Sequence, residues 1–440
     1  MSQSPMLLAL TFGNGFGSQP HAWRHPGVDP RSFGDYETMV RHARNAERAL
    51  FDFLFLPDAL GMDVDIAGQP VMYTPEPLLT LAAVARGTER IGMATTASTT
   101  FSEPYNLARM FKTLDLMSHG RMGWNVVPTA DPIGAANFGT SPLPRAEKYE
   151  RLHEVVQVVQ GLWGSWGEDA FIGDQSSGRY ADAAKVQPVN LQGRHVASRG
   201  PLPIPPSDQG QPVIFQAGGG DNGREVAGRY ANGVIGATFT IDDAIAQRTA
   251  LREAAERNGR DPDEIKFFAG VMPAFGDSVR DAVDRRLELG RDVLPTRVPY
   301  LGQMLGLRLG LDDLDRPLSS KELDAARPSP GDPRSEHALA VAREGWTLRE
   351  VLAHGVIDYH PTTVGPVSVT ADHLQEWFEA GAADGFWLSV DVHERDLDIV
   401  ADQLRPLLLE RGLVEEAYRG TTLREHLGVP RQYGLDERLR

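Results

Sequence analysis

The clearest chemical motif in this chain is a run of glycines between a strand-like and a helix-like segment. Gly218-Gly219-Gly220-Asp221-Asn222-Gly223 follows an apolar stretch at 212–216 and precedes a helical pattern. Such glycines permit close approach to the backbone, and the N–H groups of the turn and helix N-terminus can hold an anion. The spacing also fits a dinucleotide fingerprint, with Asp242 as the ribose-binding acid. Because four strand–helix units precede it, a mononucleotide phosphate is the better interpretation. A tight turn that binds nothing is the alternative.

A second stretch, SHGRMGWNVVPTADPIGAANFG at 118–139, places Asn125 near the end of a predicted strand. A helical pattern ends just before it, and a loop rich in Pro, Asp, Asn and Gly follows. In α/β folds the loops at the carboxyl ends of parallel strands hold the ligands. Asn125 is therefore a candidate binding residue.

Other polar residues follow predicted strands. Asp58 ends the apolar run FDFLFLPD, where it could accept a hydrogen bond from a heterocycle, perform acid/base work, or simply cap a turn. Thr95 and Thr96 open a hydroxyl-rich exit from the next strand and could bond polar ring atoms, although β-propensity and turn formation also explain them. These side chains would lie at one end of a parallel sheet.

Two further groups could contact an anion or a substrate. Arg145 and Tyr149 stand four residues apart at a helix start, so both can point at one anion, although a solvated helix face is the commoner fate of such a pair. His21 lies in the loop HAWRHP and could contribute an acid/base group. Metal binding is not expected, because His21 and His25 lack helical spacing and no third ligand is evident.

These residues must be positioned by alternating strands and helices. Strands are expected at 6–12, 51–56, 90–95, 121–127, 212–216, 233–239, 265–271 and 385–390. Helical patterns occur at 35–50, 76–86, 104–117, 147–163, 222–230, 242–258, 278–289, 370–380 and 396–411. This alternation predicts a (β/α)₈ TIM barrel, an α/β fold, whose strands read as apolar runs because both faces are buried. A doubly wound sheet with a second domain is the rival. We expect a single domain over 1–440, with insertions at about 165–211 and 290–366 and a carboxyl-terminal extension at about 411–440.

Composition narrows the classes of partner. A formal net charge of −16 disfavours nucleic acid and anionic membranes. The absence of Cys excludes disulfides, a thiolate nucleophile and Cys-ligated metals. The amino terminus has no basic region and its apolar run is short, so we expect a cytoplasmic protein without a signal peptide or membrane span.

Five segments together resemble a known family: FDFLFLPDAL, the stretch from TTASTT to AANFG, PVIFQAGGGDNGREVA, LQEWFEAGAADGFWL and YRGTTLREHLG. The resemblance is to flavin-dependent monooxygenases of the bacterial luciferase-like superfamily, typified by nitrilotriacetate monooxygenase component A, dibenzothiophene sulfone monooxygenase and long-chain alkane monooxygenase. It implies an insertion-bearing barrel that binds FMN, as FMNH₂ from a separate NAD(P)H:flavin reductase. Such an enzyme uses O₂ to form a C4a-(hydro)peroxyflavin, which oxygenates a small organic substrate.

The resemblance assigns roles residue by residue. Asp58, Thr95 and Thr96 match positions at the isoalloxazine edge, and Asn125 matches the Asn of a GWN motif lining the flavin. Arg145 stands where the family often has His, and Tyr149 matches a phosphate-contacting tyrosine. Gly219 and Gly220 replace the family's Ser-Ser, so a phosphate would rest on backbone N–H groups. His21 lies in a loop that resembles the family's first loop, which overlooks the active site and implies a role toward the substrate or the peroxide.

Two rival functions remain open. One is a deazaflavin-dependent oxidoreductase on the same fold, and the other is a flavin-binding protein without turnover. The sequence does not identify the substrate. Four large apolar residues in predicted loops favour an apolar or aromatic compound: Phe16, Trp23, Met62 and Met72. The resemblance also implies a homodimer or homotetramer.

Overall fold

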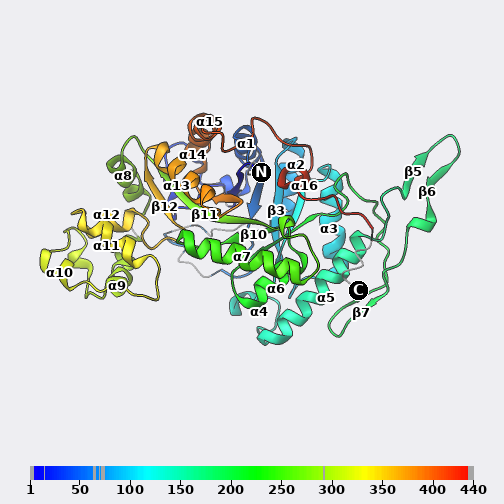
Figure 1. Cartoon of the computed structure of the whole chain (residues 1–440), viewed down its shortest axis with the longest axis horizontal. Helices are drawn as coiled ribbons and strands as arrows, with labels where there is room; N and C mark the ends of the chain where they lie inside the picture. Colours follow the sequence, from blue (N-terminus) through cyan, green and yellow to red (C-terminus); the bar gives the residue numbers. More distant parts are fainter. Residues whose placement is uncertain are drawn as a thin grey trace.

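The computed structural model describes residues 4–434 apart from 14, 63–65, 69, 71–74 and 291–292. Met72, considered above as a substrate-facing residue, lies outside the described residues. Eight parallel strands form a closed barrel surrounded by helices (Figure 1), which confirms the predicted TIM barrel. The strands, in spatial order, are β10 (Gly233–Gly236), β9 (Val213–Ala217), β4 (Met122–Val127), β3 (Gly92–Ser98), β2 (Phe53–Leu56), β1 (Leu7–Thr11), β13 (Gly385–Leu388) and β11 (Lys266–Phe275). Pairing of β10 with β11 closes the ring.

The apolar strand runs are explained by burial on two faces. One set of alternate residues fills the barrel with aromatic and aliphatic side chains: Leu7, Ala9, Phe53, Phe55, Ala94, Val213, Phe215, Ile235, Phe268 and Trp387. The other set, including Leu54, Met93 and Trp124, packs outward against the helices. Because successive strand residues point to opposite faces, this alternation tells which polar residues face the interior.

The helices around the barrel follow the predicted order. They are α1 (Tyr36–Arg48), α2 (Pro77–Gly87), α3 (Pro104–Met117), α5 (Arg145–Trp163), α6 (Asp221–Tyr230), α7 (Ile241–Arg257), α8 (Val279–Gly290), α13 (Val367–Glu379), α14 (His393–Ile399) and α15 (Arg405–Glu410). Local chemistry sets their starts: the Asp35 carboxylate accepts the Thr38 N–H at 3.1 Å and caps α1. None of the helices in the described part of the chain has the length and apolar character needed to cross a bilayer.

Two long segments interrupt the alternation. The first carries two small hairpins, β5 (Phe171–Asp174) with β6 (Arg179–Ala181) and β7 (Leu191–Gln192) with β8 (Ala197–Ser198). The β5–β6 hairpin extends away from the barrel at the right of Figure 1. Its return to the barrel is anchored on α3, where the buried Asp115 carboxylate accepts Gln209 Nε2 at 2.6 Å and the Ser207 hydroxyl.

The second segment, between α8 and β12 (Thr362–Gly365), is poorly patterned in the sequence yet mostly helical. It contains α9 (Leu294–Leu305), α10 (Ser320–Ala325), α11 (Ser335–Arg343) and α12 (Leu348–Ala353), grouped at the left of Figure 1. These helices enclose their own apolar core, which includes Val298, Leu301, Leu339 and Val351. The segment ends in β12, which pairs with the far half of β11.

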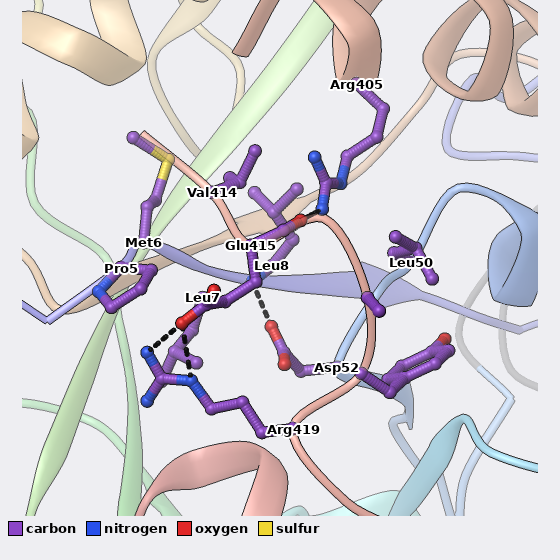
Figure 2. A pocket seen from close by; sticks show the side chains of 12 residues that line it. Pro5, Met6, Leu7, Leu8, Leu50, Asp52, Arg405, Val414, Glu415 and Arg419 are labelled. Atoms are coloured by element: carbon purple, nitrogen blue, oxygen red, sulfur yellow. Dashed lines mark hydrogen bonds and ion pairs between the residues drawn. The ribbon is translucent and has the colours of Figure 1, made fainter. Parts of the chain in front are cut away.

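The amino ends of the strands are closed by the last part of the chain. Leu423 and Leu427 of α16 (Leu423–Leu427) pack against the interior side chains at the amino ends of the strands. Nearby, a small cavity lies between β1, β2 and the segment 414–419, and Figure 2 shows Asp52 pointing at the backbone of Leu8. The Asp52 carboxylate accepts the Leu8 N–H at 2.7 Å.

Candidate active site

The candidate site lies at the opposite end, where β3 and β4 bring Thr96 and Asn125 together. The two residues are cross-strand partners, and Asn125 Nδ2 donates to Thr96 Oγ1 at 2.8 Å. Asn125 is 3% exposed, and its Oδ1 is buried without a hydrogen-bond partner. Buried polar atoms are nearly always paired in folded proteins. The Asn125 carbonyl oxygen is therefore an acceptor that a donor on a ligand would satisfy.

Neighbouring residues on the same strands point the other way. Trp124 packs outward against Phe111 and Trp163, and its Nε1 donates to Ala97 O at 3.1 Å. Thr95 is fully buried, and its hydroxyl donates to the carbonyl of Leu56 at 3.0 Å. The structure therefore separates the two threonines expected to act as a pair: Thr96 is on the interior face with Asn125, and Thr95 joins β3 to β2.

Asp58 and Thr96 line one cavity of about 440 Å³ at the carboxyl ends of β2 and β3. Glu76 and Ser98 add polar atoms, and the stacked rings of Phe101 and Phe138 form an apolar wall. Burial, helped by the negative charge of Glu76, raises the pKa of Asp58. The volume lies within the range of small-molecule sites, and one rim residue is a carboxyl with a raised pKa.

The glycine turn joins β9 to α6 at the same end of the barrel. Gly218 has a φ of 112°, a backbone conformation that favours glycine. A Cβ on Gly219 would lie 3.1 Å from Gln247 Nε2, which is buried without a partner, whereas Gly220 faces open space. The Asp221 side chain is 87% exposed and paired with Arg224, which also donates to Gly219 O at 3.0 Å. The turn therefore presents backbone and amide donors beside a carboxylate whose charge is paired with an arginine.

The start of α5 is more basic than the predicted pair suggests. Arg145 is the first residue of α5 and is exposed, while Tyr149 is half-buried one turn later. Lys148 lies between them, with its Nζ 5.3 Å from the centre of the Tyr149 ring. Burial and then the charge of Arg145 lower the pKa of Lys148. Two cations and a phenol thus occupy one turn. The sequence had pointed to Arg145 and Tyr149 but not to Lys148.

His21 is buried in the loop after β1, next to the 3₁₀ turn Ala22–Arg24. It lines a cleft of about 770 Å³ whose other walls come from α8 and from the start of α14. Its place beside the barrel is fixed by the neighbouring loop residues, because Ser18 N donates to Val390 O at 2.9 Å just after β13. His21 and Asn125 thus lie over different strands at the same end of the barrel.

One buried residue of this end was missed by sequence reasoning. His360 is 2% exposed, and its ring lies 5.1 Å from that of Trp387, edge to face. A Cβ built on the inward-facing Gly270 would overlap its imidazole, so the ring lies over that glycine. Both of its ring nitrogens lack a partner, as does Trp387 Nε1. Burial lowers the pKa of His360 to about 4, so the imidazole is neutral.

Comparison with known proteins agrees with this geometry. Residues 11–383 match the family described as luciferase-like monooxygenase. Dibenzothiophene-sulfone monooxygenase of Rhodococcus erythropolis (strain XP) is 36% identical over 444 residues, covering 97% of both chains. Nitrilotriacetate monooxygenase component A of Aminobacter aminovorans is 33% identical over 426 residues, covering 93% of both chains.

A solved structure extends the similarity to the whole fold. EDTA monooxygenase from Chelativorans sp. BNC1 superposes with a TM-score of 0.82 at 30% identity, over 98% of this chain and 100% of that chain. Similarity of sequence and fold therefore runs over nearly the full length. The chain belongs to the luciferase-like monooxygenase family, a family of flavin-dependent enzymes.

Proposed function

We propose that this protein is the oxygenating component of a two-component, FMNH₂-dependent monooxygenase. The observation that carries the proposal is the buried Asn125 Oδ1 without a partner, held by Thr96 at the carboxyl end of the barrel. A flavin ring edge carries N–H donors that such an acceptor would bind. The adjacent cavity and glycine turn offer room for a ring system and for a phosphate.

Each part of FMN has candidate contacts on this chain. Asp58, Thr96 and Asn125 would hold the ring, and Thr95 supports them by fastening β3 to Leu56. The phosphate would be held by cations, a phenol and backbone N–H groups, supplied by Arg145, Lys148, Tyr149, Gly219 and Gly220. Bound reduced flavin would supply the electrons that activate O₂. The protein's own residues then orient flavin and substrate and exclude water.

Reduced flavin would come from an NAD(P)H:flavin reductase, delivered by diffusion. The relative named as component A of a nitrilotriacetate monooxygenase supports a division of labour between two proteins. His21, in a separate cleft at the same end of the barrel, is proposed to contact the organic substrate. A homodimer or homotetramer remains a proposal that sedimentation velocity would test.

The test is an anaerobic titration with FMNH₂ followed by turnover under ¹⁸O₂. We expect saturable binding of reduced FMN and one ¹⁸O atom in the product when a panel including dibenzothiophene sulfone and EDTA is screened by mass spectrometry. A protein that ignores FMNH₂ but reduces a deazaflavin without O₂ would sink the proposal. Binding of FMN with no product from any compound and no change in its reoxidation by O₂ would favour the non-catalytic alternative.

A further inference from the structure

The cleft that contains His21 has walls from three elements that follow adjacent strands. The loop after β1 contributes Arg24 and His25, α8 after β11 contributes Arg285 and Glu288, and α14 after β13 contributes Arg395. In the barrel these strands stand in the order β1-β13-β11. The cleft therefore opens at the carboxyl end of the barrel, where ligands of this fold bind.

The three walls are fastened to one buried carboxylate. Asp391 lies just after β13. Its carboxylate accepts a hydrogen bond from Nε2 of Gln19, in the loop after β1, at 3.0 Å. It also accepts two hydrogen bonds from Arg286 of α8, from Nε at 3.0 Å and from a terminal nitrogen at 3.1 Å. Arg286 also donates to Asp358 at 2.8 Å. A shared anchor of this kind fixes the distance between the walls, so the cleft is a preformed site.

The lining of the cleft is cationic in a chain of net charge −16. Three arginines line it against one acid, Glu288. Arg285 pairs with Asp281, and Arg395 donates its Nε to the fully buried Asp396, but neither carboxylate lines the cleft. A guanidinium carries five N–H donors, so Arg285 and Arg395 keep donors beyond these ion pairs.

His25 reports the sign of the local field. Burial lowers its pKa, and the positive charges of Arg395 and Arg285 lower it further, against a weaker opposite effect of Glu288. The field at His25 is therefore positive even with the neighbouring acids in place. Such a cleft attracts anions and repels cations.

We propose that this cleft binds the carboxylates of the substrate, and that the substrate is an organic compound carrying two or more carboxylate groups. This inference rests on the proposed monooxygenase function. Planar carboxylates match the forked donors of Arg24, Arg285 and Arg395, and the cleft volume suits a small polycarboxylate. Two of the compared relatives, the EDTA and nitrilotriacetate monooxygenases, are named for compounds of this class.

The probe is tricarballylate, with its neutral triamide as the isosteric control, added to the flavin-free full-length protein in a calorimetric titration. We expect tricarballylate to bind with an affinity that falls as salt rises from 50 to about 200 mM, and the triamide not to bind. Equal binding of the triamide, or no binding of tricarballylate, overturns the proposal.

Three variants of α8 distinguish binding in the cleft from a general effect of protein charge on tricarballylate affinity. We expect Arg285→Gln to weaken tricarballylate binding about fivefold and Glu288→Gln to tighten it by a similar factor. Arg280→Gln, on the same helix but outside the cleft, should change it by less than about twofold. An Arg280 effect as large as that of Arg285 would overturn the assignment to this cleft.

A parallel FMN titration keeps the two proposals apart. Because the cleft and the cavity lined by Asp58 and Thr96 share no lining residue, tricarballylate binding without FMN binding would uphold the cleft and refute the cofactor. FMN binding without tricarballylate binding would refute the cleft alone.

Discussion

Asn125 donates a hydrogen bond to Thr96 across two parallel strands and leaves its carbonyl oxygen unpaired inside the barrel. The amide nitrogen is held by Thr96, and the amide oxygen is left to accept a hydrogen bond from a ligand. The pair thus combines a fixed orientation with an open acceptor, which is the arrangement that a bound heterocycle requires.

Replacing Asn125 by Ala should weaken FMN binding about tenfold, the loss expected when one or two hydrogen bonds worth roughly 1 kcal/mol each are removed. Thr96→Val should act in the same direction. Thr95→Val is the matched control, because its hydroxyl bonds Leu56 O on the outer face. We expect it to lower the free energy of unfolding by about 1 kcal/mol and to leave FMN affinity within about twofold. Fluorescence titration and urea unfolding measure both, and a larger flavin loss from Thr95→Val would contradict the interior assignment.

The basic turn of α5 predicts discrimination between FMN and riboflavin. Arg145→Gln and Lys148→Gln should each weaken FMN binding about three- to tenfold, because an exposed cation near a phosphate contributes roughly 0.5–1.5 kcal/mol. Riboflavin, which lacks the phosphate, should bind both variants and the parent protein equally. Equal losses for the two ligands would show that the turn does not meet the phosphate. Arg151 lies farther along α5 but donates to Thr99 O, so Arg151→Gln is unsuitable as a control. Arg179→Gln, at an exposed position of β6 in the outlying hairpin, serves instead.

Gly270→Ala tests whether His360 belongs to the site. A methyl group there would overlap the imidazole and displace it from the barrel. We expect the pKa of His360 to rise from about 4 toward the ordinary histidine value, followed in the NMR signals of ¹⁵N-histidine, and turnover to fall more than FMN affinity. Gly34→Ala, where a methyl meets open space, is the control. Unchanged turnover in Gly270→Ala with a shifted His360 would assign His360 a packing role only.

Asp52 predicts a pH dependence of stability that has nothing to do with the site. Burial raises its pKa from 3.8 to about 7. Between these pH values the folded protein therefore holds a proton that the unfolded chain has released. Its contribution is complete below pH 4 and is lost as the pH rises through 7. Because one pKa unit corresponds to about 1.4 kcal/mol, the loss is at most roughly 4 kcal/mol, and the partial exposure of Asp52 makes it smaller. Urea unfolding between pH 5 and 8 should show this slope, and Asp52→Asn should flatten it.

Regular alternation made the barrel predictable. All eight strands and the helices between them were located because strands buried on two faces are apolar without interruption. Asn125, Asp58 and the glycine turn were found because each directly follows or ends such a run. The orientation of Thr95 could have been inferred from strand alternation, which places adjacent residues on opposite faces.

The remainder depends on contacts between distant segments. Helices α10 to α12 have only six to nine residues, α9 contains Pro299, and their core also draws on the connecting loops and on Leu287 of α8, so no strong periodicity marks them. His360 lies between α12 and β12, and its burial depends on Gly270, ninety residues earlier in the sequence. Lys148 was overlooked because its significance comes from the tertiary position of α5. Local patterns cannot reveal such pairings.

The pairing of β1 with β13 has a consequence for biosynthesis. Leu7 leaves the ribosome almost four hundred residues before its partner Gly385 is made. At typical rates of about 5–20 residues per second, the apolar edge of β1 stays uncovered for tens of seconds. A chain that ends just before β13 contains seven of the eight barrel strands, and it leaves the edges of β1 and β11 open to pair with other chains.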